Sequence, residues 1–297
     1  MTTRKKTIFW LIGAAAAIVL LLLCLLLLPQ IIDSDALKTR LQTVIEEQTG
    51  GQVHYQQAEL SFLPRPSLTL AQIELEIPGQ AAGTVGAIYV YPEILALLTG
   101  QVHLAKLVLE SPEIVLTLPA STDTPPPETA PLTLSSLQNH LAEGLAPLAK
   151  NAPDLTLAIS NGALTIHQGK DRLASTRELN LTLSLDVAEA GSLQADLQGS
   201  TTALTLQHNG QDVVIDNLDL RSSLHADKTQ AALTIDKLTL GSPALQLKGG
   251  FSLGANSPAF KLELQGSEID VDATRKTALA LSENGSVTHE IFNYLRG

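Results

Sequence analysis

The residues most able to do chemistry are scattered along the 297-residue chain. No pair of its seven histidines has the H-x-x-x-H or H-E-x-x-H spacing that brings two imidazoles to one metal ion. The histidines are His54, His103, His140, His167, His208, His225 and His289. Cys24 is the only cysteine, so the chain can form neither a thiolate metal cluster nor an intramolecular disulfide. The sequence therefore predicts no metal site and no cofactor site.

The acidic residues are poor candidates for paired acid–base catalysis. Asp216 and Asp219 are three positions apart, so on a regular strand their side chains would face opposite sides of the sheet. No G-x-x-x-x-G-K-[ST], G-x-G-x-x-G or G-x-S-x-G string occurs, which removes the common phosphate-binding loops and the hydrolase nucleophile elbow. We expect a protein without catalytic residues, which is not an enzyme.

The charge balance argues against a nucleic-acid partner. The formal net charge is −11, and Arg4, Lys5 and Lys6 supply three of the 19 basic residues. The rest of the chain therefore sets 16 Lys and Arg against 30 Asp and Glu. Nucleic-acid binding needs a basic footprint, which this composition lacks.

The chain begins with a segment long and apolar enough to cross a bilayer. Ile8 to Leu28 are 21 residues without a charged or polar side chain. A helix of this length spans ~31 Å, which matches a hydrocarbon core of ~30 Å. A cleaved signal peptide is the alternative, but its apolar region is normally ~7–15 residues and ends in a small-residue cleavage site. We expect an uncleaved anchor over residues 8–29, in contact with the lipid bilayer through residues 8–28.

The charges on either side of this segment predict its orientation. Arg4, Lys5 and Lys6 precede it and Asp33 follows it. Positive charge is retained on the cytoplasmic side of a membrane. Residues 1–7 are therefore expected in the cytoplasm and residues 30–297 on the far side.

The helices and strands expected after the anchor are predicted from the spacing of apolar residues, which changes along the chain. Residues 34–48 and 134–149 have the helical period, residues 92–100 read as a short helix, and five prolines make residues 119–131 a linker. A period of two indicates half-buried strands. It occurs over residues 53–63, 67–77, 84–91 and 103–118.

From residue 154 to 271 the alternation hardly breaks. Leucines and isoleucines occupy one side of each run, while Thr, Asn, Gln and Asp occupy the other, and Gly, Asn and Asp form the turns. This pattern predicts a meander of short strands in a long antiparallel sheet, followed by helices over 272–282 and 287–295. The expected divisions are 1–7, 8–29, an α+β module over 30–118, a linker over 119–132, a β-repeat region over 133–271, and a helical tail over 272–297.

Three short motifs stand out in the N-terminal half: T-G-G-Q-V at 49–53, P-R-P-S-L-T-L at 64–70, and L-x-L-x-S-P-x-I-x-L at 107–116. With these motifs, the N-terminal half resembles the AsmA family of membrane-anchored periplasmic proteins. The resemblance covers about residues 30–118 and is looser to about 265. Gly51 stands where the family usually has Arg or Lys.

This resemblance implies a mainly β fold, in which a curled antiparallel sheet forms a β-groove with a few short amphipathic helices. The family is related to bridge-like lipid-transfer proteins and is tied to outer-membrane biogenesis and phospholipid traffic. For this chain it implies an anchor in a bacterial inner membrane and a periplasmic ectodomain. The implied partners are phospholipid and other envelope-assembly proteins.

The apolar strand faces are compatible with a lipid ligand. Ten or so strands present such faces, and only two or three short helices are available to cover them. Acyl chains could do so, since each buried methylene contributes ~0.8 kcal/mol. The groove candidates are Leu157, Ile159, Leu181, Leu183, Leu185, Leu233, Ile235, Leu245, Leu247, Leu262 and Leu264.

Two alternatives remain open from the sequence. The sheet could fold on itself or onto its helices and leave no cavity. The protein could also be a structural scaffold without lipid cargo, docking envelope-assembly partners by strand addition at its open edges.

Overall fold

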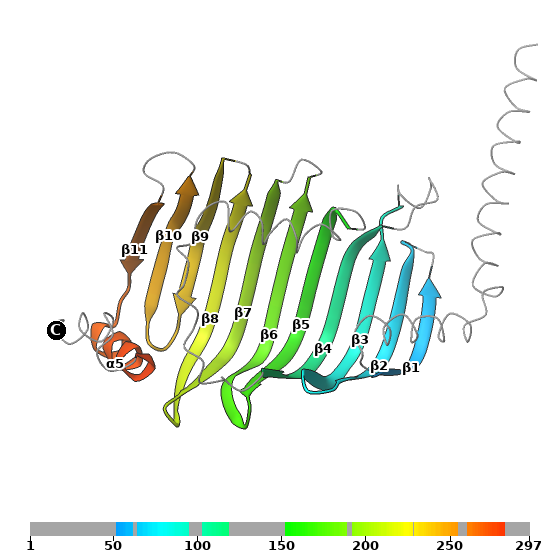
Figure 1. The fold of residues 1–297 in the computed structure, drawn as a ribbon, viewed down its shortest axis with the longest axis horizontal. Helices are drawn as coiled ribbons and strands as arrows, with labels where there is room; N and C mark the ends of the chain where they lie inside the picture. The colour runs from blue at the N-terminus through cyan, green and yellow to red at the C-terminus, as the bar shows by residue number, and fades with distance from the viewer. Residues whose placement is uncertain are drawn as a thin grey trace, which may run out of the picture.

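The computed structural model describes the following residues of the chain: 52–61, 64–94, 103–118, 152–188, 192–227, 229–254 and 260–282. Within them, one sheet of eleven strands is followed by one helix (Figure 1). Every strand lies beside the next strand in the sequence, from β1 to β11. The chain is therefore mainly β, and the sheet is open, with β1 and β11 at its two edges.

The element bounds agree well with the alternation in the first part of the chain. The strands there are β1 (Gln52–Ser61), β2 (Ser67–Ile77), β3 (Ala81–Pro92) and β4 (Leu104–Leu118). The later strands are β5 (Asp154–Gln168), β6 (Asp171–Val187), β7 (Leu193–His208), β8 (Gln211–Ala226), β9 (Gln230–Leu240), β10 (Leu245–Gly254) and β11 (Phe260–Ser267). The helix is α5 (Val271–Leu281).

Several expected segments lie outside the described residues. They are the anchor over 8–29, the helix over 34–48, most of the helix over 92–100, the linker over 119–132, and the helices over 134–149 and 287–295. In the described part of the chain, no helix has both the length and the apolar character needed to span a membrane.

The prediction of a wholly antiparallel sheet is wrong at one junction. β4 and β5 are parallel, with Lys106 beside Thr156 and Leu118 beside Gln168. Strands joined by a tight turn must be antiparallel, whereas parallel neighbours need a connection of a dozen or more residues. Residues 119–153 provide that length between β4 and β5, and all other neighbouring pairs are antiparallel.

The prediction of short strands is also wrong, because pairs of apolar runs belong to single long strands. β4 to β8 are 15 to 17 residues long. In β5, for example, Leu155–Ile159 and Leu164–Ile166 are the two halves of one strand. What separates the halves is a local change of backbone conformation, which does not end the strand.

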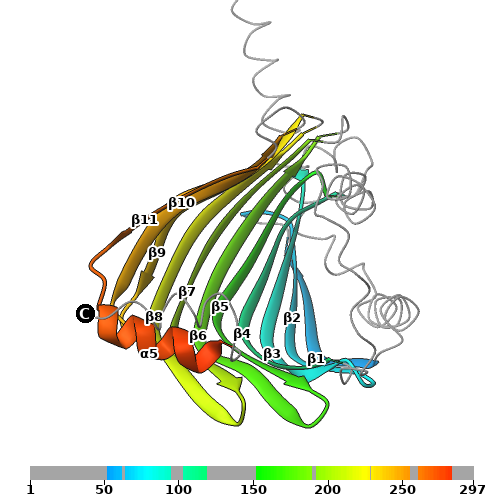
Figure 2. The same ribbon diagram turned by 60° about the vertical axis from the view of Figure 1, so that its left-hand side comes forward.

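This change forms a line across the sheet, which we call the crease. It is marked by Gln72, Ser111, Asn161, Glu178 and Asn217, whose φ angles lie between +49° and +53°. The strand pairing is interrupted beside these residues in each ladder from β1 to β8. A left-handed residue within a strand bends it, as in a β-bulge. Figure 2 shows the result, since the strands bend together and the sheet curls.

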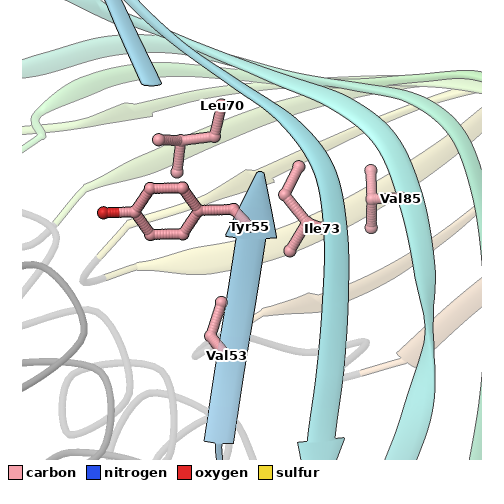
Figure 3. Close-up of a cluster of buried hydrophobic side chains, with 5 residues drawn as sticks. All are labelled: Val53, Tyr55, Leu70, Ile73 and Val85. Atoms are coloured by element: carbon pink, nitrogen blue, oxygen red, sulfur yellow. The ribbon is translucent and has the colours of Figure 1, made fainter. Parts of the chain in front are cut away.

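The apolar residues stay on one side of the sheet across the crease. Their spacing steps from two to three there, as in Leu70 to Ile73, Ile159 to Gly162 and Ile215 to Leu218. Val53, Tyr55, Leu70, Ile73 and Val85 form one cluster. Leu70 lies on one side of the crease, and the other four residues lie on the opposite side of it. Figure 3 shows these side chains projecting from the face around which the sheet curls. We call this side the inner face and the opposite side the outer face.

Helix α5 begins directly after the last strand. Asp270 is its N-cap, and one carboxylate oxygen accepts a hydrogen bond from the Ala273 backbone N–H at 2.9 Å. The Asp270 backbone N–H donates to the Ala244 carbonyl at 2.9 Å, which ties the start of the helix to the turn before β10. The capping side chain explains why the helix starts at Val271.

Candidate functional site

The strand register places all eleven groove candidates on the inner face. In the middle of the sheet, Leu157 pairs with Leu183 and Ile159 with Leu181. Leu183 then pairs with Leu197, and Leu197 with Ser222. Cross-strand partners project to the same side, so this row continues to Ile235 on β9. Leu185, Leu233, Leu245, Leu247, Leu262 and Leu264 join the same face through the neighbouring rows.

None of these eleven side chains is buried. Leu233, Leu262 and Leu264 are 38%, 54% and 58% exposed, and the other eight are half-buried. A closed core would bury leucines in the middle of a sheet almost completely. Among the described residues, no large side chain is less than 2% exposed. The inner face therefore remains accessible over much of its area.

The inner face carries no charged residue between the turns, within the part of the chain that the structure describes. Its polar side chains there, among the described residues, are the small hydroxyls of Thr176, Thr201 and Ser222 and the phenol of Tyr55. The Thr201 hydroxyl donates to the carbonyl of Arg177 at 2.6 Å, and the Thr176 hydroxyl accepts from the Leu164 N–H at 3.2 Å. Both hydroxyls thus satisfy backbone groups beside the crease.

The outer face holds the charges, and several of them pair with one another. Lys237 Nζ lies 2.6 Å from an Asp219 carboxylate oxygen, and Lys261 Nζ lies 2.8 Å from Glu263. Arg172 pairs with Asp212. These pairs are exposed, so each contributes little stability. The outer surface of the sheet is therefore charged, whereas the inner surface is aliphatic.

The acidic residues considered for acid–base chemistry occupy this outer face. Asp216 and Asp219 do not face opposite sides as the regular alternation predicts, because the left-handed Asn217 lies between them. Ile215 and Leu218 take the inner positions, which leaves both aspartates outside. Asp219 already pairs with Lys237. The two aspartates are therefore not arranged as a catalytic acid–base pair.

The crease is the feature that reasoning from the sequence missed. Asn180 supports it, because its side-chain oxygen accepts from the Asn161 N–H at 3.0 Å and its amide donates to the Glu178 carbonyl at 3.1 Å. Gly162 is needed beside it, since a Cβ at that position would lie 2.8 Å from Ile159 Cγ2. The three-residue step between apolar positions, repeated from strand to strand, is the signal that could have located the crease.

The inner face is closed in two places, one at β1–β3 and one at the β6–β9 ends where Val187, Leu193, Ala195, Ala226 and Ala231 pack together. Val53, Tyr55, Leu70, Ile73 and Val85 are only 2–6% exposed. Burial raises the pKa of the Tyr55 hydroxyl above its ordinary value, because the phenolate would lose its hydration. Leu75, Ile88 and Leu109 pack against this group. We call the five buried residues at β1–β3 the terminal cluster.

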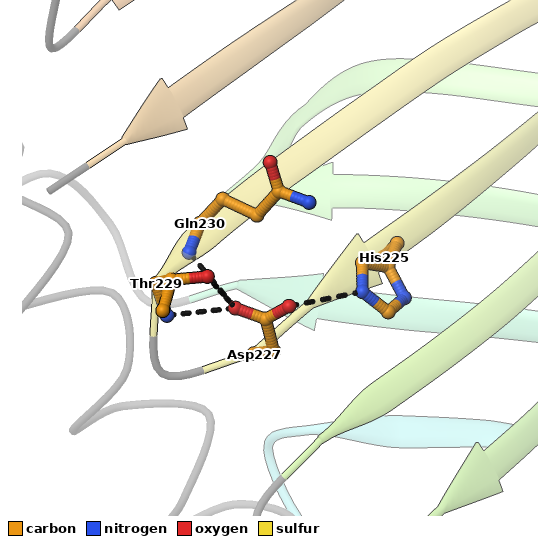
Figure 4. Close-up of polar contacts among 4 residues, drawn as sticks. All are labelled: His225, Asp227, Thr229 and Gln230. Carbon is orange, nitrogen blue, oxygen red and sulfur yellow. Dashed lines mark hydrogen bonds and ion pairs between the residues drawn. The ribbon is translucent and has the colours of Figure 1, made fainter. Parts of the chain in front are cut away.

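A polar constellation lies at the β8–β9 turn (Figure 4). Asp227 accepts hydrogen bonds from the Thr229 hydroxyl at 2.7 Å and from the backbone N–H groups of Thr229 and Gln230 at 2.7 and 3.0 Å. His225 Nε2 lies 3.3 Å from the other carboxylate oxygen. The Thr229 hydroxyl, and then these backbone groups, hold the pKa of Asp227 well below its usual range. The carboxylate lies between hydroxyl and imidazole, so the imidazole cannot activate the hydroxyl. The arrangement caps the turn.

No group of three His, Cys, Asp or Glu side chains in the described residues is placed to hold a metal ion. The described residues instead form one open, curled sheet, which is aliphatic on its inner face and charged on its outer face. The inner face is closed at the terminal cluster and again at Val187, Leu193, Ala195, Ala226 and Ala231, and is accessible over much of the rest.

These features define a class of curled single-sheet proteins with an apolar inner face. The sequence model of the AsmA family matches residues 1–170, and the chain belongs to the AsmA family. The resemblance noted from the sequence is thereby confirmed. No curated protein matches the chain. Membership suggests a function related to biogenesis of the cell envelope, and the family is not known to be catalytic.

Proposed function

We propose that this protein is a non-catalytic envelope protein that binds or conducts phospholipid by holding its acyl chains in an apolar groove along the inner face. One observation carries the proposal. The inner face of an eleven-stranded sheet has no charged residue between the turns of its described part, and the eleven groove candidates on it remain half-buried or exposed.

The physical argument is that a sheet needs a second layer. Domains are stable when the apolar face of a sheet packs against another sheet or a layer of helices. Leu233, Leu262 and Leu264 are 38%, 54% and 58% exposed, so a second layer covers them only in part. Acyl chains can supply the missing layer, at ~0.8 kcal/mol for each methylene removed from water.

We further propose that the chain acts at a bacterial inner membrane, with residues 8–29 as a single anchor, residues 1–7 in the cytoplasm and residues 30–297 in the periplasm. The apolar run from Ile8 to Leu28 and the preceding Arg4, Lys5 and Lys6 support this orientation. A reporter that is active only in the periplasm, fused after Gly297, should be active. A mature N-terminus near residue 30 would contradict the anchor.

The lipid proposal is tested by purifying the full-length protein in nanodiscs made of a synthetic phospholipid absent from bacteria. The protein is then separated from the scaffold and its bound lipids are identified by mass spectrometry. We expect bacterial phospholipid retained from the cell at near-stoichiometric amount. Protein without retained lipid, which also fails to take up the synthetic lipid, would refute lipid binding.

A second candidate is a scaffold without lipid cargo, favoured by the free edge of the sheet. Within the described residues β11 pairs only with β10, and residues 261–267 are all exposed. Such an edge can add a strand from a partner protein. Lipid-free protein that binds a partner through Phe260–Ser267 would favour the scaffold.

A further inference from the structure

The edge strand β11 lacks most of the features that keep an edge from pairing with a further strand. Natural edge strands are often bulged, very short, interrupted by proline or covered by another element. The ladder of β11 with β10 runs without a register shift, from Phe260 opposite Leu253 to Ser267 opposite Gln246. β11 contains no proline, and residues 261–267 are all exposed. It therefore presents a regular row of backbone hydrogen-bonding groups, protected only by its charged side chains.

The two edges of the sheet differ in the cover of their apolar side chains. Val53 and Tyr55, on the inner face of β1, are 6% and 5% exposed. Leu262 and Leu264, on the inner face of β11, are 54% and 58% exposed. A strand added beside β11 would flank these two leucines, and removing their apolar surface from water favours association. The β11 edge is thus the better of the two for docking a partner.

The described residues that follow β11 leave this edge uncovered. The Asp270 backbone N–H donates to the Ala244 carbonyl at 2.9 Å, which turns the chain back toward the β9–β10 connection. Helix α5 then contacts β8, and Figures 1 and 2 show the helix below the end of β11 rather than beside the strand. Among the described residues, nothing therefore occupies the side of β11 that faces away from β10.

The side chains of β11 are self-complementary. Lys261 and Glu263 lie on the outer face and alternate with Leu262 and Leu264 on the inner face. When two antiparallel copies of β11 are centred on Leu262, Lys261 of each copy lies opposite Glu263 of the other, and the two Leu262 side chains lie together. Centring on Lys261 or Glu263 would place like charges opposite each other. Centring on Leu264 would place both charges opposite uncharged residues.

We propose that β11 is a homodimer interface, in which two copies of the chain pair antiparallel about a twofold axis at Leu262. Lys261 Nζ and Glu263 Oε1 lie 2.8 Å apart within one strand, and the dimer replaces this pair with two ion pairs between strands. Because the same strand serves in both copies, the assembly closes at two. The twofold axis is perpendicular to the sheet, so the inner faces lie on one side and form a continuous apolar surface. This inference concerns assembly and does not depend on a lipid ligand.

Cysteine cross-linking of the full-length protein in detergent micelles tests the pairing and its register. Cys24 is replaced by alanine so that each variant has a single thiol. Directly opposed residues of an antiparallel pair have Cα atoms ~4.5–5.5 Å apart, which suits a disulfide. Leu262→Cys should therefore give a disulfide-linked dimer under mild oxidation. Leu264→Cys is the matched control and should not, because its two copies would be ~14 Å apart in this register.

Charge reversal provides a second measurement, the dimer dissociation constant from sedimentation equilibrium in the same micelles. Lys261→Glu places two glutamates opposite each other at both contacts and should raise the dissociation constant by about tenfold or more. Adding Glu263→Lys to this variant restores opposite charges and should restore the dimer. Lys248→Glu changes the net charge equally at an exposed outer position of β10 and should leave the dimer unchanged.

A protein that stays monomeric at all concentrations would overturn the proposal, as would a dimer that Lys261→Glu leaves intact. Equal disulfide yields from Leu262→Cys and Leu264→Cys would overturn the register on which the ion pairs depend. A monomer whose β11 pairs with a strand of another protein would refute the homodimer and favour the scaffold. Far-ultraviolet circular dichroism of each variant separates loss of the dimer from loss of the fold.

Discussion

Replacing Leu233 with aspartate measures how open the inner face is where β9 crosses it. Leu233 is 38% exposed, so part of its side chain is buried against neighbours on β8 and β10. Full burial of a leucine stabilises by ~1.5–3 kcal/mol, and losing the buried part costs about 1–2 kcal/mol. The carboxylate keeps contact with water and avoids most of the several kcal/mol that an unpaired buried charge costs. We expect Leu233→Asp to lower the free energy of unfolding by about 1–2 kcal/mol.

The assay is urea unfolding of the full-length protein followed by far-ultraviolet circular dichroism. With a slope of ~3 kcal/mol per molar urea, the midpoint should fall by about 0.5 M and the transition should stay cooperative. Ile73→Asp is the closed-core reference, because Ile73 is 2% exposed. That variant should lose several kcal/mol and with it much of its folded signal. If Leu233→Asp behaved like Ile73→Asp, the inner face would be a closed core in solution and the argument for a groove would fail.

Three further predictions test local features. Glu178 is exposed with φ +51°, so Glu178→Gly should change stability by less than about 1 kcal/mol, and Glu178→Val should be about 1–2 kcal/mol less stable than the glycine variant. Both are measured by urea unfolding, and equal stabilities would contradict a left-handed residue at the crease. Gly83→Ala should cost about 3 kcal/mol by the same assay, because its Cβ would overlap the Glu113 carbonyl oxygen of β4; an unchanged midpoint would rule out this close approach. The pKa of Asp227 is lowered on folding. Its carboxylate therefore stabilises the turn at any pH above the ordinary value of ~3.9, and this stabilisation is lost progressively as the pH falls below that value. The carboxyl carbon resonance of Asp227 should shift only in acid stronger than pH ~3.9, and a titration midpoint at or above that value would contradict the capped turn.

The sequence predicts the strand positions well because one face is apolar throughout. A slip of one residue would turn every apolar side chain to the charged face, so the alternation specifies where each strand lies and which side faces in. β2 spans Ser67–Ile77, as the alternation over 67–77 predicts. The same alternation explains why candidates as distant as Leu157 and Leu264 lie on one face.

The sequence does not as readily predict strand length or direction. A left-handed residue such as Asn161 interrupts the period of two, and the interruption resembles the end of a strand. The parallel contact of β4 with β5 depends on the path of residues 119–153, which no local pattern encodes. The exposure of the inner face cannot be predicted from the sequence either, because leucines alternate with polar residues in the same way whether or not a second layer covers them.

The parallel junction between β4 and β5 has a consequence for how the chain folds. Every other neighbouring pair is joined by a connection of at most 11 residues, so those contacts are local and can form quickly. The β4–β5 ladder instead joins residues 50 positions apart along its whole length, from Lys106 with Thr156 to Leu118 with Gln168. Closing that loop costs chain entropy before any of its contacts form. Nearest-neighbour arrays fold as coupled units, so we expect β1–β4 and β5–β11 to form as two kinetic units whose joining limits the folding rate.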